Sequence, residues 1–128
     1  GMLDGLGYTS LKGALMASGA REISRLIKEI GGDEITAYGL SHLGDYQATL
    51  FSDFSHNRCF GESFARNNEY DKLAEGVYTV KALLLLGWQY NVDLPISKAV
   101  YDIMYNKKDI IATLLKLYER PLKDEFRE

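Results

Sequence analysis

The chain has little cysteine and little proline: its 128 residues include one cysteine and two prolines. A lone cysteine cannot form an intramolecular disulfide, which is typical of a reducing compartment, so we expect a cytoplasmic protein. The longest strongly apolar run, Ala82 to Leu86, has five residues, whereas a membrane-spanning helix needs about 20. No basic region followed by an apolar stretch opens the chain, so we also expect no signal peptide and no membrane span.

The chain also lacks an excess of positive charge. The chain has fifteen Lys and Arg residues and eighteen Asp and Glu residues, for a net charge of −3. This balance argues against nucleic acid as a partner. Apolar residues make up 46% of the chain, as in a globular domain, and a domain this size needs no disulfide or metal to fold. The opening Gly1-Met2 is typical either of a tag remnant or of a cut inside a larger protein.

Apolar residues recur at helical spacing, and no segment alternates with the period of a strand, so we predict an all-α fold. Met16, Ala20, Ile23, Ile27 and Ile30, for example, form one helical stripe. Helices are expected from Thr9 or Ser10 to Gly31, from Asp33 to Gly39, from Leu43 to Phe51, from Ser55 towards Asn67, from Val77 to Trp88, from Pro95 to Asn106, and from Asp109 to Tyr118.

The apolar positions also predict which helices are buried. Residues 77–88 are apolar on nearly every face, which predicts a central, buried helix. The next two helices should each bury one stripe. Those stripes are Ile96, Val100, Ile103 and Met104 in the first, and Ile111, Leu114, Leu115 and Tyr118 in the second.

The densest polar stretch is Ser55-His56-Asn57-Arg58, at an expected helix N-terminus. Unpaired N–H groups and the helix dipole favour an anion there, and these side chains add donors and positive charge. A phosphate or carboxylate would therefore bind well. The alternative is an ordinary N-cap serine followed by a solvated first turn.

Other polar residues allow further sites. Asp45 and Thr49 are four apart and share a helix face, where a carboxylate and a hydroxyl could hold a polyol; Asp45 could equally be a helix cap. Glu75 could cap the helix after it or reach a ligand across a cleft. Cys59 follows His56 by three residues, but no third group completes a catalytic arrangement. His42 and Asp45 lack a third ligand, so we expect no metal.

Several segments carry a resemblance to one known family. Gly44-Asp45, Thr49 and the stretch from Ser55 to Gly61 resemble the pattern G-D-x(3)-T-x(5)-S-R-N-R-x-F-G of bacterial-type NAD(P)-dependent glycerol-3-phosphate dehydrogenases. Other segments match that family in order and spacing: Asp4-Gly5-Leu6-Gly7, Gly31-Gly32-Asp33, Glu75-Gly76-Val77-Tyr78-Thr79, Leu94-Pro95-Ile96 with Ala99-Val100-Tyr101, and Arg120-Pro121-Leu122-Lys123.

The resemblance implies the all-helical C-terminal domain of that enzyme, of the 6-phosphogluconate-dehydrogenase-like type. Residues 1–122 would form the helical substrate-binding domain and residues 123–128 a solvated tail. An N-terminal Rossmann domain, absent from this chain, would hold most of the NAD or NADP. The substrate pair would be dihydroxyacetone phosphate and sn-glycerol 3-phosphate. The family's acid–base lysine would lie upstream of Gly1, so no catalytic residue is expected here, and Lys12, Lys28 and Lys72 do not match its context.

The resemblance also assigns roles to single residues. Asp45, with Thr49, would contact the glycerol hydroxyls, Ser55 and Asn57 would help to hold the substrate, and Glu75 would lie near the cofactor. The family's arginine that touches substrate phosphate and cofactor is His56 here. Neutral histidine offers one donor where arginine offers a charged fork. An alternative is therefore a non-catalytic helical binding or dimerisation module from a divergent relative, and a homodimer is possible in either case.

Overall fold

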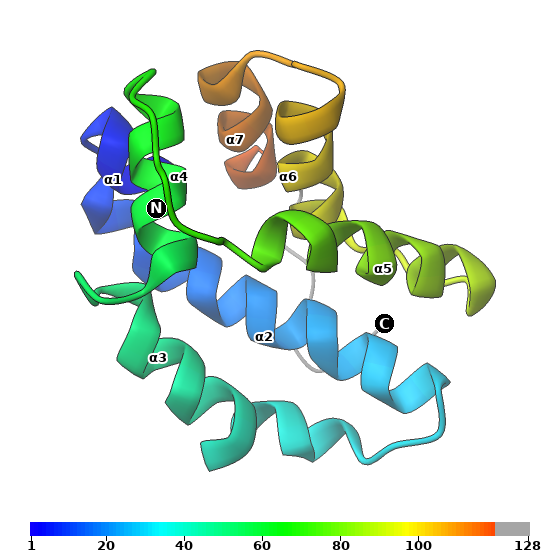
Figure 1. The fold of residues 1–128 in the computed structure, drawn as a ribbon. Coiled ribbons are helices and arrows are strands. Elements are labelled where there is room, and N and C mark those ends of the chain that lie inside the picture. The colour runs from blue at the N-terminus through cyan, green and yellow to red at the C-terminus, as the bar shows by residue number, and fades with distance from the viewer. Residues whose placement is uncertain (120–128) are drawn as a thin grey trace.

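A computed structural model describes residues 1–119, and every regular element within them is helical (Figure 1). This confirms the all-α prediction. The last residues of the expected domain, 120–122, and the expected tail, 123–128, lie outside the described residues. In chain order the elements are α1 (Met2–Leu6), η1 (Thr9–Leu11), α2 (Lys12–Glu29), η2 (Glu34–Tyr38), η3 (Leu40–Gly44), α3 (Asp45–Leu50), α4 (His56–Ala65), α5 (Gly76–Gln89), α6 (Pro95–Tyr105) and α7 (Ile110–Tyr118).

Local capping chemistry sets several boundaries where the sequence predicts them. The side chain of Ser55 accepts a hydrogen bond from the Arg58 N–H at the start of α4 (3.3 Å). Asp33 accepts from the Ile35 N–H (3.1 Å) and Asp109 from the Ala112 N–H (2.8 Å) in the same way. Each cap satisfies a backbone N–H that has no partner within its helix, so these predicted starts are confirmed.

Helix α1 was not expected, because five residues that include glycine show no helical periodicity. It packs closely on α4, and Gly5 is what allows the approach. A Cβ at Gly5 would lie 2.5 Å from the carbonyl oxygen of Glu62. A contact this close between two backbones requires glycine, so α1 depends on tertiary packing for its stability.

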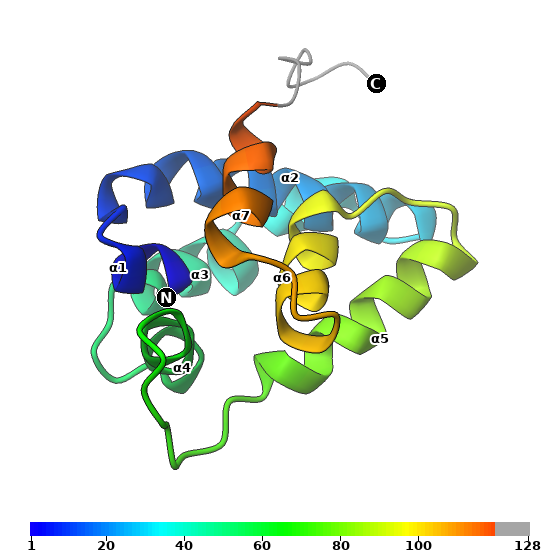
Figure 2. The ribbon, with the colours of Figure 1, turned by 90° about the horizontal axis from the view of Figure 1, so that it is seen from above.

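The core lies where α1, α6 and α7 meet. Its buried members are Leu3, Ile103 and Leu114, from these three helices. Viewed from above, α7 lies between the α1 side and α6, while α2 runs along one side of the molecule (Figure 2). This core joins the first helix to the last two, so the chain between them is held at both ends.

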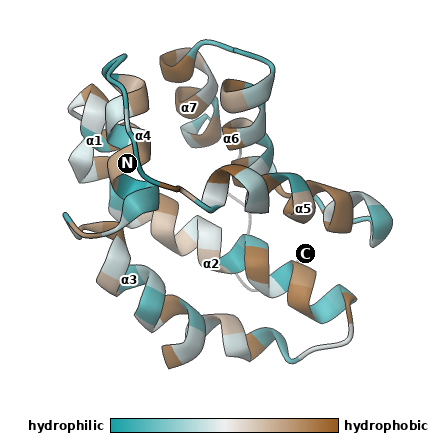
Figure 3. Cartoon of the chain, in the orientation of Figure 1, coloured by the Kyte–Doolittle hydropathy of each residue, from teal (hydrophilic) through white to brown (hydrophobic). Residues whose placement is uncertain are grey.

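The prediction for residues 77–88 is wrong. Only Val80 and Gly87 of α5 are buried, whereas Tyr78, Leu85 and Trp88 are 66%, 68% and 85% exposed. One side of α5 packs on α6, and apolar residues remain along the rest of the helix (Figure 3). An all-apolar helix signals burial on every face, but within the described residues only one side has a packing partner.

The predicted buried stripe is confirmed on α6 and only partly confirmed on α7. On α6, Ile103 is buried and Ile96, Val100 and Met104 are half-buried, as expected. On α7, Leu114 is buried and Tyr118 is half-buried, as predicted. Ile111 and Leu115 are exposed instead, and Ile110 and Leu117 pack at the core. The stripe at 110, 114 and 117 has the same helical spacing as the predicted one, so the sequence identified the helix but not its rotation.

A buried carboxylate fixes the start of α6. The Glu22 side chain accepts from the Ile96 N–H (2.7 Å), the Ser97 N–H (3.0 Å) and the Ser97 hydroxyl (2.7 Å). Its burial raises its pKa, which these hydrogen bonds only partly offset. Glu22 therefore supplies from α2 the cap that the residue before Pro95 cannot provide.

Glu22→Ala is expected to lower the free energy of unfolding by about 3 kcal/mol, because it leaves the buried donors at the start of α6 unpaired. Urea unfolding of the 128-residue chain measures the loss. Glu29→Ala, at the exposed end of α2, is the control and should change stability by less than about 0.5 kcal/mol. Equal losses in the two variants would contradict the capping role.

Candidate functional site

The N-termini of α4 and α5 converge, although 19 positions separate the residues that join them (Figure 1). The Asn57 carboxamide oxygen accepts from the Gly76 N–H at 2.9 Å. A Cβ at Gly76 would stand 3.2 Å from that oxygen, so glycine suits this contact. Two helix N-termini, each with a partial positive charge, thus lie side by side, an arrangement suited to an anion. The first N–H groups of α5 are already bonded, Gly76 to Asn57 and the next two to the carbonyls of Ala74 and Glu75.

The donors of Ser55 and Asn57 are only partly used by the fold. Ser55 acts as an acceptor in its cap, so its hydroxyl proton can still be donated. Within residues 1–119, the Asn57 amide group makes its bond through oxygen, and its Nδ2 has no acceptor. Both residues can therefore offer donors to a bound oxyanion while they hold the helix ends in place.

His56 is exposed at the first position of α4. Its Nδ1 lies 2.7 Å from the hydroxyl oxygen of Tyr70, in the segment between α4 and α5. Tyr70 was not singled out from the sequence. Partial desolvation, with Cys59 and Asp71 nearby, raises the pKa of Tyr70, so its hydroxyl keeps its proton at neutral pH.

Arg58 does not belong to the anion site that the sequence suggested. Its side chain is 10% exposed and its Nη1 binds Asp4 at 2.9 Å and Glu62 at 2.8 Å. Its Nε donates to the Ser52 carbonyl at 2.6 Å. With its donors directed at the protein, Arg58 holds α4 against α1 and does not supply positive charge to the site.

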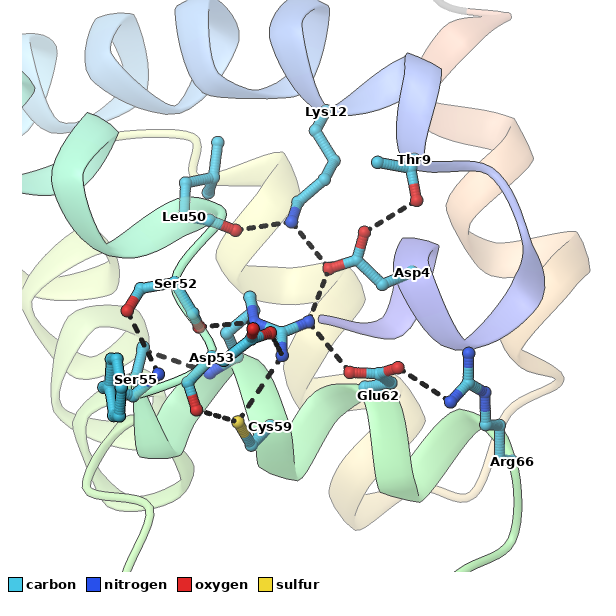
Figure 4. Close-up of polar contacts among 12 residues, drawn as sticks. Asp4, Thr9, Lys12, Leu50, Ser52, Asp53, Ser55, Cys59, Glu62 and Arg66 are labelled. Carbon is cyan, nitrogen blue, oxygen red and sulfur yellow. Dashed lines mark hydrogen bonds and ion pairs between the residues drawn. The ribbon is translucent and has the colours of Figure 1, made fainter.

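Lys12 completes this buried ion cluster, which no sequence motif predicted (Figure 4). The side chain is 3% exposed, and its Nζ lies 2.6 Å from Asp4 Oδ2. It also donates to the Leu50 carbonyl and lies 4.5 Å from the centre of the Phe51 ring. Asp4 therefore joins α1, α2 and α4, and Lys12 extends the connection to the end of α3.

Asp45 and Thr49 lie on α3, one short loop before Ser55. Both are exposed, and the Thr49 hydroxyl donates to the backbone carbonyl of Asp45 at 3.2 Å. The N-cap of α3 is Gly44, with no side-chain cap bond, so the alternative role of Asp45 as a cap is wrong. No hydrogen bond within the described residues connects this pair to Ser55 or Asn57.

Glu75 directly precedes α5 and is exposed beside the Asn57–Gly76 contact. It occupies the N-cap position, but its side chain makes no cap bond, so its alternative role as a cap is also wrong. Its backbone carbonyl accepts from the Thr79 hydroxyl at 3.1 Å. The carboxylate is left accessible at the edge of the converging helix ends.

The remaining candidates do not form sites. The Cys59 Sγ lies 3.2 Å from the Asp53 carbonyl, whereas His56 Nδ1 pairs with Tyr70. His42 Nδ1 lies 2.9 Å from the Ala37 carbonyl. Among residues 1–119, no three His, Cys, Asp or Glu side chains are grouped to hold a metal ion. None of the described helices is both long and apolar enough to cross a membrane.

An apolar cavity of about 250 Å³ lies beside the converging helix ends. Asn57 and Gly76 form part of its wall, together with Phe60, Val77 and Met104. Its polar lining comes from few groups, Lys12 and Asn57 among them. The donors of the helix ends thus adjoin an apolar wall, a combination common in small-molecule sites.

Together, these features define an all-α domain whose converging helix ends form a candidate anion site. The comparisons with known proteins specify it further. Residues 1–115 match the family model described as NAD-dependent glycerol-3-phosphate dehydrogenase C-terminus. The chain belongs to this family.

Curated relatives agree over almost the whole chain. Glycerol-3-phosphate dehydrogenase [NAD(P)+] of Pelodictyon phaeoclathratiforme is 36% identical over 98% of this chain and 40% of its own length. The proteins of the same name from Thermus thermophilus and Solidesulfovibrio magneticus are each 39% identical, over 98% of this chain and 41% and 40% of their own lengths. The chain thus spans about two fifths of the relatives it matches.

Proposed function

We propose that this chain is the substrate-binding domain of an enzyme that interconverts dihydroxyacetone phosphate and sn-glycerol 3-phosphate with NAD(P)H. The observation that carries the proposal is the convergence of α4 and α5 at the Asn57–Gly76 hydrogen bond. Two helix N-termini with spare side-chain donors suit a phosphate group. The names of the relatives support this substrate class.

Different residues contact the two ends of the substrate. Ser55, His56 and Asn57 hold the phosphate end, since their donors surround the start of α4. Asp45 and Thr49, on the exposed surface of α3, contact the glycerol hydroxyls through carboxylate and hydroxyl oxygens. These contacts orient the substrate carbon that changes its oxidation state.

The cofactor is NAD or NADP, held mainly by an N-terminal Rossmann domain of the same protein. The accessible Glu75 carboxylate fits a cofactor hydroxyl or amide donor, and the imidazole of His56 can add a donor beside it. When bound, the cofactor supplies or removes the hydride. Proton transfer falls to a lysine upstream of Gly1, so we place no acid–base residue in this chain.

The exposed face of α5 supports a packing partner for the domain. Tyr78, Leu85 and Trp88 leave apolar surface open there, and such surface is typical of an interface. We place the N-terminal domain or a second copy of the protein against it. We also place the enzyme in the cytoplasm, since its single cysteine is free.

Turnover by the full-length protein tests this function. Dihydroxyacetone phosphate with NADH or NADPH should give sn-glycerol 3-phosphate and oxidised cofactor, and the 128-residue chain alone should give none. His56→Arg is the matched variant at the phosphate end. Activity only in His56→Arg would mean that the substrate differs from the one proposed. Folded but inactive protein in both cases would contradict the proposal and favour a non-catalytic binding or dimerisation module.

A further inference from the structure

Tyr70 is fixed by aromatic packing rather than free in a surface loop. Its ring meets the Phe60 ring edge-on, with centroids 6.2 Å apart and planes at 76°. Phe60 in turn stacks on Phe64, one helical turn further along α4, at 6.0 Å. The hydroxyl that faces His56 is therefore carried by a ring that α4 itself holds in place.

The hydrogen bond between Tyr70 and His56 has a preferred direction. Neutral imidazole has one acceptor nitrogen and one N–H donor. The raised pKa of Tyr70 keeps its O–H intact, and a phenol O–H donates well to an imidazole nitrogen. Taking the phenol O–H as the donor to Nδ1 across the 2.7 Å contact places the proton of neutral His56 on Nε2.

The same hydroxyl also suits the charged ring. In the imidazolium both nitrogens carry protons, and the Nδ1–H can donate to the Tyr70 oxygen, because a hydroxyl both donates and accepts. Nε2 is then a donor in either charge state of His56. Without the hydroxyl, the neutral ring can shift its proton to Nδ1 and turn a lone pair towards an anion.

We propose that Tyr70 is a positioning residue that keeps His56 Nε2 protonated, so that His56 always offers a donor to an anionic oxygen at the start of α4. This deepens the proposed function, on which its catalytic consequence rests. The tautomer itself rests on the Tyr70–His56 contact and on the phenol O–H as its donor, not on the proposed function. His56 stands where the family pattern has an arginine, which is a donor at every pH. With Nε2 always protonated, His56 would also be a donor at every pH.

His42 provides an internal comparison, because the chain has two histidines. Its Nδ1 lies 2.9 Å from the Ala37 carbonyl oxygen. A carbonyl can only accept, so neutral His42 must carry its proton on Nδ1. Under the proposal, the two histidines of the chain therefore carry opposite tautomers.

Long-range ¹H–¹⁵N NMR on the labelled 128-residue chain tests the assignment at pH 8, above the usual histidine pKa of about 6.5. We expect the signature of protonated Nε2 for His56 and of protonated Nδ1 for His42. Tyr70→Phe should move the His56 nitrogens towards averaged tautomers and leave those of His42 unchanged, which also shows that the variant is folded. Protonated Nδ1 in wild-type His56, or a His56 signature unchanged in Tyr70→Phe, would overturn the proposal.

Kinetics of the full-length protein test the consequence for the ligand. Tyr70→Phe should raise the KM for dihydroxyacetone phosphate about tenfold and change kcat much less, because a ground-state contact is weakened. Glutamine has no tautomers, so adding Tyr70→Phe to the His56→Gln variant should not change its KM further. Tyr90→Phe, at the far end of α5, is the matched control. An unchanged KM in active Tyr70→Phe enzyme would overturn the positioning role. An inactive wild type with the expected NMR signatures would instead reject the proposed function and leave the tautomer assignment intact.

Discussion

Replacing Asp4 with asparagine is expected to lower the free energy of unfolding by about 4 kcal/mol, the largest stability loss we expect in this chain. One carboxylate oxygen of Asp4 binds both Lys12 Nζ at 2.6 Å and Arg58 Nη1 at 2.9 Å. The side chains of these two cations are only 3% and 10% exposed. Removing the carboxylate charge leaves both of them close together without full compensation, and chemical unfolding of the chain measures the loss.

Asp53→Asn is the matched control, because Asp53 pairs with the same arginine at 3.3 Å but is 93% exposed. Solvent screens that pair, so the control should lose less than about 0.5 kcal/mol. Similar losses in the two variants would show that the buried cluster does not stabilise the fold as described.

The pH dependence of stability gives a second readout of Asp4→Asn. Burial raises the pKa of Asp4, but hydrogen bonds from Lys12, Thr9 and Arg58 outweigh it and bring the pKa to about 2. Because the pKa is lower in the folded state, the ionised carboxylate stabilises the fold above the unfolded value of about 4. As the pH falls from 5 to 2, wild type should lose about 2 kcal/mol more than Asp4→Asn. Parallel pH profiles would contradict this assignment.

Asn57→Asp should reduce kcat/KM of the full-length enzyme for dihydroxyacetone phosphate about 100-fold. The new carboxylate keeps the oxygen that accepts from Gly76 but replaces a donor with a negative charge beside the phosphate. Stability should be unchanged or higher, since a negative charge in the first turn of α4 is favourable. Steady-state kinetics of the variant should therefore show lost activity, while its thermal unfolding shows no lost stability.

Asn67→Asp adds the same charge just after the other end of α4. Asn67 has a positive φ of 56°, which aspartate tolerates, so the control should fold and keep kcat/KM within about twofold. If Asn57→Asp and Asn67→Asp behaved alike, the phosphate could not lie at the start of α4.

A feature could be predicted from the sequence when its residues lie close together in the chain. The helix caps of Ser55, Asp33 and Asp109 were predictable because each cap bond joins residues two or three positions apart. The buried charges depend on contacts that sequence spacing does not show. Arg58 lies 54 positions from Asp4, and its place beside Ser55 in sequence suggested a solvent-facing charge. Only the packing of α1 on α4 turns it inwards.

The candidate site was partly predictable for the same reason. Ser55, His56 and Asn57 are consecutive and begin one helix, so their grouping follows from the sequence. The contact of Asn57 with Gly76 and that of His56 with Tyr70 span 19 and 14 positions. Both contacts form only because the segment between α4 and α5 folds back towards the start of α4. The roles of all the predicted site residues remain predictions: Asp45, Thr49, Ser55, His56, Asn57 and Glu75.

A crystal structure of the full-length protein with sn-glycerol 3-phosphate and NAD(P)⁺ would show where the phosphate binds. We expect phosphate oxygens within hydrogen-bonding distance of His56 Nε2 and Asn57 Nδ2, at the convergence of α4 and α5. We also expect Asp45 beside the glycerol hydroxyls and the Tyr70 hydroxyl still bonded to His56 Nδ1. A phosphate bound elsewhere, with His56 and Asn57 facing solvent, would contradict the proposed function.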